Sequence, residues 1–161
     1  MELYILRHGI AEDHNAGGDE RRALTDEGRR KLRRVLERAE MAKVEPSLIL
    51  SSPFTRARQT AELAAEVLRY NKKIVEIEAL IPESAPEKVW EEIRERRQEN
   101  AILLASHEPL LSSTIAWLLG TPTMQVDMKK GALARIDVDR FGPRAQGVLR
   151  WLLTPRLAGA D

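Results

Sequence analysis

The sequence predicts an α/β fold, a three-layer α/β/α sandwich with a mostly parallel central sheet. Two observations lead to this prediction. Continuous apolar runs such as Leu3–Leu6 and Ala101–Ala105 are typical of strands buried on both faces, as the strands of parallel sheets are. Segments with apolar residues at helical spacing alternate with these runs, which is the pattern of a parallel sheet covered by helices.

The first helix is expected after a polar, glycine-containing loop that follows the strand Leu3–Leu6. Thr25 is a good N-cap residue, and Asp26 and Glu27 suit the first turn because carboxylates are stabilised at a helix N-terminus. The residues of this helix that are expected to face the core are Leu32, Val35, Leu36 and Ala39.

The rest of the chain continues the alternation. Ser52 and Pro53 predict the start of a second helix, as a cap residue followed by proline at the first helical position. Pro86 is expected to begin a third helix and Gly120 to end a fourth. The other expected elements are strands at 48–50, 73–78 and 101–105, a helix at about 110–119, and strands near 132–138 and 147–153. No linker or repeat divides them, so residues 1–161 are predicted to form one domain.

The composition excludes several classes of protein. Of the 161 residues 43% are hydrophobic, which suffices for one sizeable core. The net charge of +1 argues against broad binding to nucleic acid or membrane surfaces. The lack of cysteine excludes disulfides, thiolate metal sites and cysteine nucleophiles. The N-terminus has no signal-peptide pattern and the apolar runs are too short to cross a bilayer, so we expect a cytoplasmic protein.

Polar residues directly follow three of the predicted strands, as the groups Arg7–Gly9, Ser52–Arg56 and Ser106–Pro109. Because ligands of open α/β sheets bind at the carboxyl ends of the strands, these groups are expected to converge on one anion-binding site. Arginine suits such a site because its planar guanidinium forms paired hydrogen bonds with phosphate oxygens. A histidine among arginines can attack phosphorus and form a covalent intermediate. We therefore expect His8 to be the nucleophile, neutral at one ring nitrogen, and His107 to be a protonated donor.

The three motifs resemble those of the histidine phosphatase (phosphoglycerate mutase-like) superfamily. The matching segments are Arg7-His8-Gly9, residues 52–61 (SPFTRARQTA) and His107-Glu108-Pro109. Within the superfamily the chain most resembles the SixA-type phosphohistidine phosphatases, through RHGIA at 7–11, RALTDEG at 22–28 and its compact length. Two positions depart from the family pattern: Ala23 replaces a proline and Ser106 replaces a glycine.

The resemblance implies a phosphoglycerate mutase-like fold and a role for each matching residue. It implies that His8 is the nucleophile of a phosphatase that needs no cofactor and no metal. The residues that it implicates in binding the phosphorylated substrate are Arg7, Gly9, Arg56 and His107, with Arg22 at the mouth of the pocket. Three histidines without a paired carboxylate motif also offer no convincing set of metal ligands.

The identity of a proton donor stays open at this point. A phosphate ester needs a general acid for its leaving group, usually a carboxyl group with a raised pKa. Glu83 is one candidate, and Glu12 and Asp13, soon after the first motif, are others. None of them can be aligned securely with the family's acid. Because a nitrogen leaving group needs less help, the missing acid favours a phosphohistidine substrate over an ester.

Three functions follow from these residues. The favoured one is a SixA-type protein phosphohistidine phosphatase, whose partner is a phosphorylated protein such as a phosphohistidine-containing phosphotransfer protein. The second is a broad-specificity phosphomonoesterase for small molecules, with a mutase as a less favoured form. The third is a non-catalytic module that binds a phosphorylated ligand, which the presence of a nucleophile disfavours. We expect a monomer or weak dimer that binds neither nucleic acid nor membranes.

Other charged and aromatic residues have simpler interpretations. The first helix carries a basic face, which is either solvated or a docking surface for an acidic phosphoprotein; its residues are Arg29, Arg30, Arg33, Arg34 and Arg38. His14 and Arg58 are expected at the surface. The three tryptophans, Trp90, Trp117 and Trp151, are expected in the core or at a subunit contact.

Overall fold

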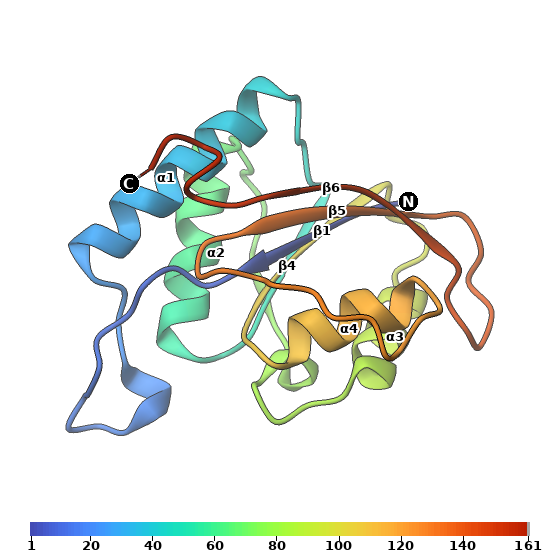
Figure 1. Ribbon diagram of the computed structural model, residues 1–161, viewed down its shortest axis with the longest axis horizontal. Helices are drawn as coiled ribbons and strands as arrows, with labels where there is room; N and C mark the ends of the chain where they lie inside the picture. Colours follow the sequence, from blue (N-terminus) through green and yellow to red (C-terminus); the bar gives the residue numbers. More distant parts are fainter. Residues whose placement is uncertain (161) are drawn as a thin grey trace.

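Figure 1 shows the computed structural model of the protein, which describes residues 1–160. Over these residues six strands form a sheet in the order β3-β2-β4-β1-β5-β6. The strands are β1 (Glu2–Arg7), β2 (Leu48–Ser51), β3 (Val75–Glu76), β4 (Ala101–Ser106), β5 (Leu133–Val138) and β6 (Gly147–Leu153). The first four run parallel to one another, and β5 and β6 extend the sheet in antiparallel pairings. The prediction of a mostly parallel sheet is therefore confirmed.

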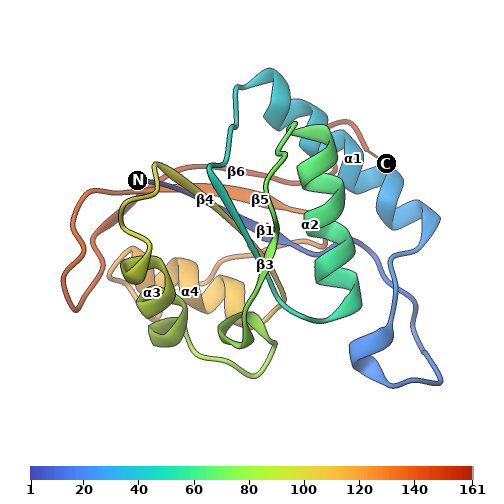
Figure 2. The ribbon, with the colours of Figure 1, turned by 180° about the vertical axis from the view of Figure 1, so that it is seen from behind.

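Helices cover both faces of the sheet. On one face α1 (Asp26–Met41) packs beside α2 (Thr55–Val67), and on the other α3 (Pro86–Glu95) packs beside α4 (Leu110–Leu118) (Figures 1 and 2). Short 3-10 turns lie at Asp19–Arg21 and Glu78–Leu80. These layers are the predicted α/β/α sandwich.

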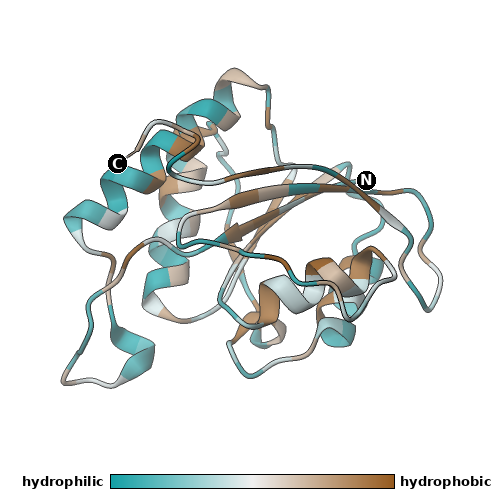
Figure 3. Cartoon of the chain, in the orientation of Figure 1, coloured by the Kyte–Doolittle hydropathy of each residue, from teal (hydrophilic) through white to brown (hydrophobic). Residues whose placement is uncertain are grey.

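The side chains of β1 alternate between two hydrophobic cores, because successive residues of a strand point to opposite faces. Leu3 and Ile5 belong to the core beneath α3 and α4, where Trp90 is the largest buried side chain. Tyr4 and Leu6 belong to the core beneath α1 and α2. Figure 3 shows apolar residues along the sheet and hydrophilic residues on the outer sides of the helices. The expected inward residues of α1, Leu32, Val35, Leu36 and Ala39, are all buried.

The helix starts confirm two capping predictions and correct a third. The Thr25 side chain accepts a hydrogen bond from the Gly28 N–H at the start of α1, and Pro86 is the first residue of α3. The prediction that Ser52 and Pro53 begin α2 is wrong, because the helix begins at Thr55. The Ser52 hydroxyl instead lies 2.8 Å from Nε2 of His107. Residues 52–54 are therefore a loop that serves the site.

The expected strand at 73–78 is mostly absent. Only Val75 and Glu76 pair with β2, and the chain then enters the 3-10 turn Glu78–Leu80. This strand lies at the edge of the sheet, with a partner on one side only. An alternating pattern predicts an extended chain but does not determine how many residues find a partner.

The start of α1 packs tightly against the chain that leaves β1. The N–H of Thr25 donates to the carbonyl oxygen of Ile10 at 3.0 Å. A Cβ atom on Gly28 would overlap that same carbonyl group. Gly28 therefore allows α1 to lie directly beside the segment that carries the first motif.

We predict that Gly28→Ala lowers the free energy of unfolding by at least about 2 kcal/mol, because the new methyl group must displace backbone atoms. Urea denaturation measures this change. Gly142→Ala is the matched control: its Cβ would come no closer than 4.0 Å to a neighbouring atom, so we expect a change within about 0.5 kcal/mol. Equal effects of the two substitutions would contradict the close approach of α1 to Ile10.

Candidate active site

The three sequence motifs meet at the carboxyl edge of the parallel strands. His8 follows β1, His107 follows β4, and Arg56 lies in the first turn of α2. All three side chains are buried, with exposed fractions of 5%, 1% and 5% respectively. The two imidazole ring centres are 5.1 Å apart, and Nε of Arg56 donates a hydrogen bond to Nε2 of His8 at 3.3 Å. The site is thus an enclosed pair of histidines beside a guanidinium group.

Backbone and side-chain hydrogen bonds determine which nitrogen of His8 carries its proton. Nδ1 lies 2.7 Å from the carbonyl oxygen of Gly9, an acceptor only, so the proton is on Nδ1. Nε2 accepts from Arg56 and therefore holds a lone pair. The N–H of Gly9 donates to the Thr60 hydroxyl at 3.2 Å, which in turn donates to the carbonyl of Arg56. The sequence analysis expects Gly9 to bind substrate. In the structure its carbonyl oxygen accepts from His8, and its N–H is bound to Thr60.

His8 is neutral at ordinary pH. The pKa of its imidazole is lowered to about 3, chiefly by burial and also by the positive charges of Arg56, Arg7 and Lys130. The hydrogen bond to Gly9 acts in the opposite direction because it stabilises the protonated ring. A neutral ring with the Nδ1–H tautomer leaves Nε2 available as a nucleophile, as the sequence analysis required of His8.

His107 has one partnered and one unpartnered ring nitrogen. Nε2 lies 2.8 Å from the Ser52 hydroxyl, whereas Nδ1 is buried without a hydrogen-bond partner. Burial, followed by the neighbouring His8 and Arg56, lowers the pKa of His107 to about 2. The expectation of a protonated His107 is therefore wrong for the ligand-free protein. An anion in contact with the ring would raise this pKa again, since opposite charge favours the protonated form.

Arg7 also has an unpartnered donor. Its Nη1 donates to the carbonyl oxygen of Met128 at 2.6 Å, which holds the guanidinium at the end of β1, while Nε is buried without a partner. Buried polar atoms are nearly always hydrogen-bonded. The unpartnered nitrogens of Arg7 and His107 are suited to contact the oxygens of a phosphoryl group.

Asp19, which the sequence analysis did not single out, forms ion pairs with both Arg56 and Arg22. Its carbonyl oxygen accepts from Nη1 of Arg56 at 2.8 Å, and its carboxylate contacts Nη2 of Arg56 at 3.2 Å. The same carboxylate contacts Nη1 of Arg22 at 2.7 Å. The hydrogen bond from Arg22, and then the charge of Arg56, lower the pKa of Asp19, so it is ionised. Arg22, expected at the pocket mouth, therefore reaches the site through Asp19.

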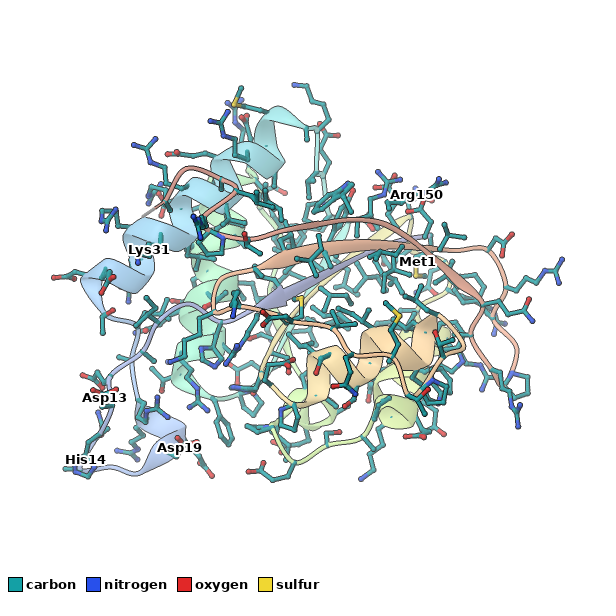
Figure 4. All side chains as sticks on the ribbon, viewed as in Figure 1. Met1, Asp13, His14, Asp19, Lys31 and Arg150 are labelled. Carbon is teal, nitrogen blue, oxygen red and sulfur yellow. The ribbon has the colours of Figure 1, made fainter. Side chains whose placement is uncertain are left out.

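The candidate proton donors differ in position. Glu83 is exposed, but it is close enough for its charge to raise the pKa of Arg56, so it lies on the rim of the site. Asp13 is exposed on the outer part of the N-terminal loop, beside the exposed His14 (Figure 4). The Glu12 carboxylate accepts hydrogen bonds from the N–H of Ala23 and from Asn15, which lower its pKa. Of these three residues, Glu83 is the one whose charge acts on Arg56.

Both departures from the family pattern have a local use. The proline that Ala23 replaces has no N–H and could not donate to Glu12 as Ala23 does at 2.9 Å. The hydroxyl of Ser106 donates to the carbonyl oxygen of Leu80 at 2.6 Å, which ties the 3-10 turn to the end of β4. Neither change places a new group against His8. The exposed Arg58, as expected, lies at the surface, 3.8 Å from Glu62 and from Glu76.

Residues 1–160 contain neither a cluster of metal-binding side chains nor a membrane-spanning helix. In that range no cluster of three or more histidine, aspartate or glutamate side chains is arranged to hold a metal ion. No helix in the same range is both long enough and apolar enough to span a bilayer.

Comparisons with known proteins agree with this geometry. Residues 3–81 match the sequence model of the histidine phosphatase superfamily (branch 1). The phosphohistidine phosphatase SixA of Escherichia coli is 30% identical over 159 residues, which are 96% of this chain and 94% of that protein. An uncharacterised protein of Picosynechococcus is 33% identical over 138 residues, 83% of this chain and 82% of its own. The solved structure of the protein histidine phosphatase SixA complexed with tungstate superposes with a TM-score of 0.87 at 28% identity, over 97% of this chain and 98% of that one.

The fold, the paired histidines and these matches define the class of protein. The chain belongs to the histidine phosphatase superfamily. It is a SixA-like phosphatase, a hydrolase that acts on phosphoester or phosphoramidate bonds.

The lowered histidine pKa values make stability depend on pH. Below about pH 6.5 the unfolded chain binds protons on both histidines, whereas the folded protein does not until about pH 3, so stability falls as pH falls. Each histidine contributes a slope of about 1.4 kcal/mol per pH unit between about pH 6 and pH 4. We predict that urea unfolding of His107→Gln shows a smaller slope than the wild type, by about that amount. Parallel slopes would mean that His107 titrates alike in both states.

Asp19 competes with a bound anion for Arg56. We predict that Asp19→Asn binds inorganic phosphate about threefold to tenfold more tightly, because a negative charge beside the dianion is removed and Arg56 is released. Competitive inhibition by phosphate measures the affinity. Glu20→Gln, an exposed neighbour in the same turn, makes the same charge change and is expected to have little effect. Weaker binding in Asp19→Asn would instead assign Asp19 the role of positioning Arg56.

Proposed function

We propose that this protein hydrolyses phosphohistidine in proteins, with His8 as the nucleophile. The observation that carries the proposal is the state of His8: a buried neutral imidazole whose Nδ1–H is held by Gly9 and whose Nε2 lone pair lies beside Arg56 and His107. The similarity to SixA, whose name states activity on phosphohistidine, supports the choice of substrate.

In the first step the phosphoryl oxygens are bound by Arg7, Arg56 and His107. Nε2 of His8 attacks phosphorus, and the bond between phosphorus and the substrate's imidazole nitrogen breaks, with its electron pair going to that nitrogen. The substrate's ring, protonated at its other nitrogen, leaves as neutral imidazole. His8 then carries the phosphoryl group as a cationic ring, and its Nδ1–H is stabilised by the carbonyl of Gly9.

In the second step water attacks the phosphorus of phosphorylated His8. The bond between phosphorus and Nε2 breaks, and its electron pair returns to the ring, which is again neutral with its proton on Nδ1. Both protons of the water stay on the inorganic phosphate, which leaves as H2PO4−. The guanidinium groups of Arg7 and Arg56 stabilise the charge on the equatorial oxygens in both steps, which is the main requirement of phosphoryl transfer. His107 acts as a donor to the same oxygens when the bound anion raises its pKa.

Leaving-group chemistry favours phosphohistidine over an ester. An alkoxide needs a proton from a general acid, and the carboxyl group nearest Arg56, that of Asp19, is ionised. Glu83 on the rim is the remaining candidate for a general acid. Its position near Arg56 is the observation that favours a phosphomonoesterase. Asp13 is exposed on the outer loop. We therefore expect slow ester hydrolysis that depends on Glu83.

The test compares two substrates in the presence of EDTA: a phosphohistidine-bearing phosphotransfer domain and p-nitrophenyl phosphate. We expect fast loss of phosphohistidine, slow ester cleavage, and at least about a thousandfold loss of activity in His8→Ala. Glu83→Gln should lower ester cleavage while leaving phosphohistidine hydrolysis within about threefold.

His14→Ala, which changes an exposed histidine, is the matched control and should retain full activity. Full activity in His8→Ala would contradict the proposed mechanism. Fast ester turnover would move the protein to the phosphomonoesterases, and phosphate binding without turnover would make it a binding module.

A further inference from the structure

A basic pocket lies beside the phosphoryl site, and none of the roles above uses it. Its volume is about 890 Å³, and it lies between the start of α1, the loop before β5 and the segment after β6. Figures 1 and 2 both show that this C-terminal segment crosses α1, and Figure 4 labels Lys31 on that helix. The residues that line it are Arg7, Ile10, Lys31, Lys129, Lys130, Thr154, Pro155, Arg156 and Ala160.

Cationic and apolar residues both line the pocket. Besides Arg7, four cations line the pocket: Lys31, Lys129, Lys130 and Arg156. The pocket has no acidic lining residue among the described residues. This combination suits a ligand with several negative charges and some apolar surface.

Two acidic residues at the edge neutralise part of this charge. Glu27 lies 2.9 Å from Lys31, and Asp127 lies 2.8 Å from Lys129. Both carboxylates are exposed, so these ion pairs contribute little and are easily exchanged for others. Arg156 is exposed, and no ion pair within residues 1–160 involves it.

The pocket shares Arg7 with the active site. Arg7 lines the pocket, and its guanidinium is bound to the carbonyl of Met128, the residue before Lys129. The N–H of Gly131 donates to the backbone carbonyl of His8 at 3.0 Å, which ties the lysine loop to the nucleophile. The charge of Lys130 is close enough to lower the pKa of His8. The pocket therefore borders the site through Arg7 and the loop that holds Lys129 and Lys130.

We propose that this pocket binds an acidic segment of the phosphoprotein substrate, adjacent to its phosphohistidine. The inference rests on the proposed function, because it assigns the pocket to the part of the substrate beyond the phosphoryl group. Carboxylates of the segment contact the lysines and Arg156, and an apolar side chain covers Ile10 and Pro155. The charges also attract the partner before contact, which raises the association rate.

This location differs from the basic face of α1 considered above. On that face Arg33 pairs with Glu66 at 2.8 Å, and Arg34 with Glu37 at 3.7 Å. These exposed ion pairs are as weak as those at the edge of the pocket, so they do not distinguish the two surfaces. Arg7 lines the pocket and also belongs to the active site. The pocket is therefore the better docking site for a substrate attacked by His8.

The test is the double substitution Lys129→Glu and Arg156→Glu. The control is Lys73→Glu with Arg97→Glu, two exposed cations beyond the opposite ends of the strands, which gives the same change in net charge. We expect the pocket variant to lower kcat/KM for the phosphohistidine protein at least about tenfold, through KM, and to lower its ratio to kcat/KM for p-nitrophenyl phosphate by a similar factor. High salt should reduce the difference between wild type and variant.

Other outcomes overturn the inference in distinguishable ways. If the wild type hydrolyses the phosphoprotein and the two double variants give the same ratio, the pocket is not a docking site and the proposed function stands. If ester and protein hydrolysis fall equally, the charges act on the phosphoryl site itself. If the wild type does not act on phosphohistidine, both the function and the docking role are wrong. Lys129→Gln with Arg156→Gln should give a smaller change in the same direction, which guards against effects on folding.

Discussion

The parallel pairing of β1 with β4, and of β4 with β2, is the constraint on which the site depends. In this register Arg7 lies opposite Ser106, and Ser51 opposite Ala105. The residues that follow each strand therefore meet at one edge of the sheet. A slip of one residue in either pairing would turn the strand's side chains to the other face, because they alternate with a period of two. The hydrophobic cores on both faces of β1 prevent that slip.

The site holds arginines and histidines in a buried place, where unpaired positive charge is costly. The histidines avoid this cost by losing their protons, as their lowered pKa values indicate. Arg56 is balanced by Asp19, and Arg7 by the carbonyl oxygen of Met128. A phosphoryl group supplies the missing negative charge, so its binding relieves an electrostatic cost that the folded protein already bears.

The two halves of the sheet contribute different parts of this arrangement. The parallel strands carry the buried groups around His8, each at a strand end. The antiparallel extension, β5 and β6, brings the loop with Lys129 and the segment with Arg156 to the neighbouring rim. Chemistry common to a superfamily thus lies in one half, and a surface able to distinguish substrates lies beside it, with Arg7 in both.

The sequence by itself determined the alternation of strands and helices, the cap at Thr25 and the three motifs, because each of these depends on residues close together in the chain. Only the tertiary structure decided that α2 begins at Thr55, since Ser52 serves a histidine 55 residues away. It also decided the contact of Asp19 with Arg56, 37 residues apart, and the pocket formed where the C-terminal segment crosses α1. Local periodicity and propensity carry no information on such contacts, because they arise from how separate elements pack.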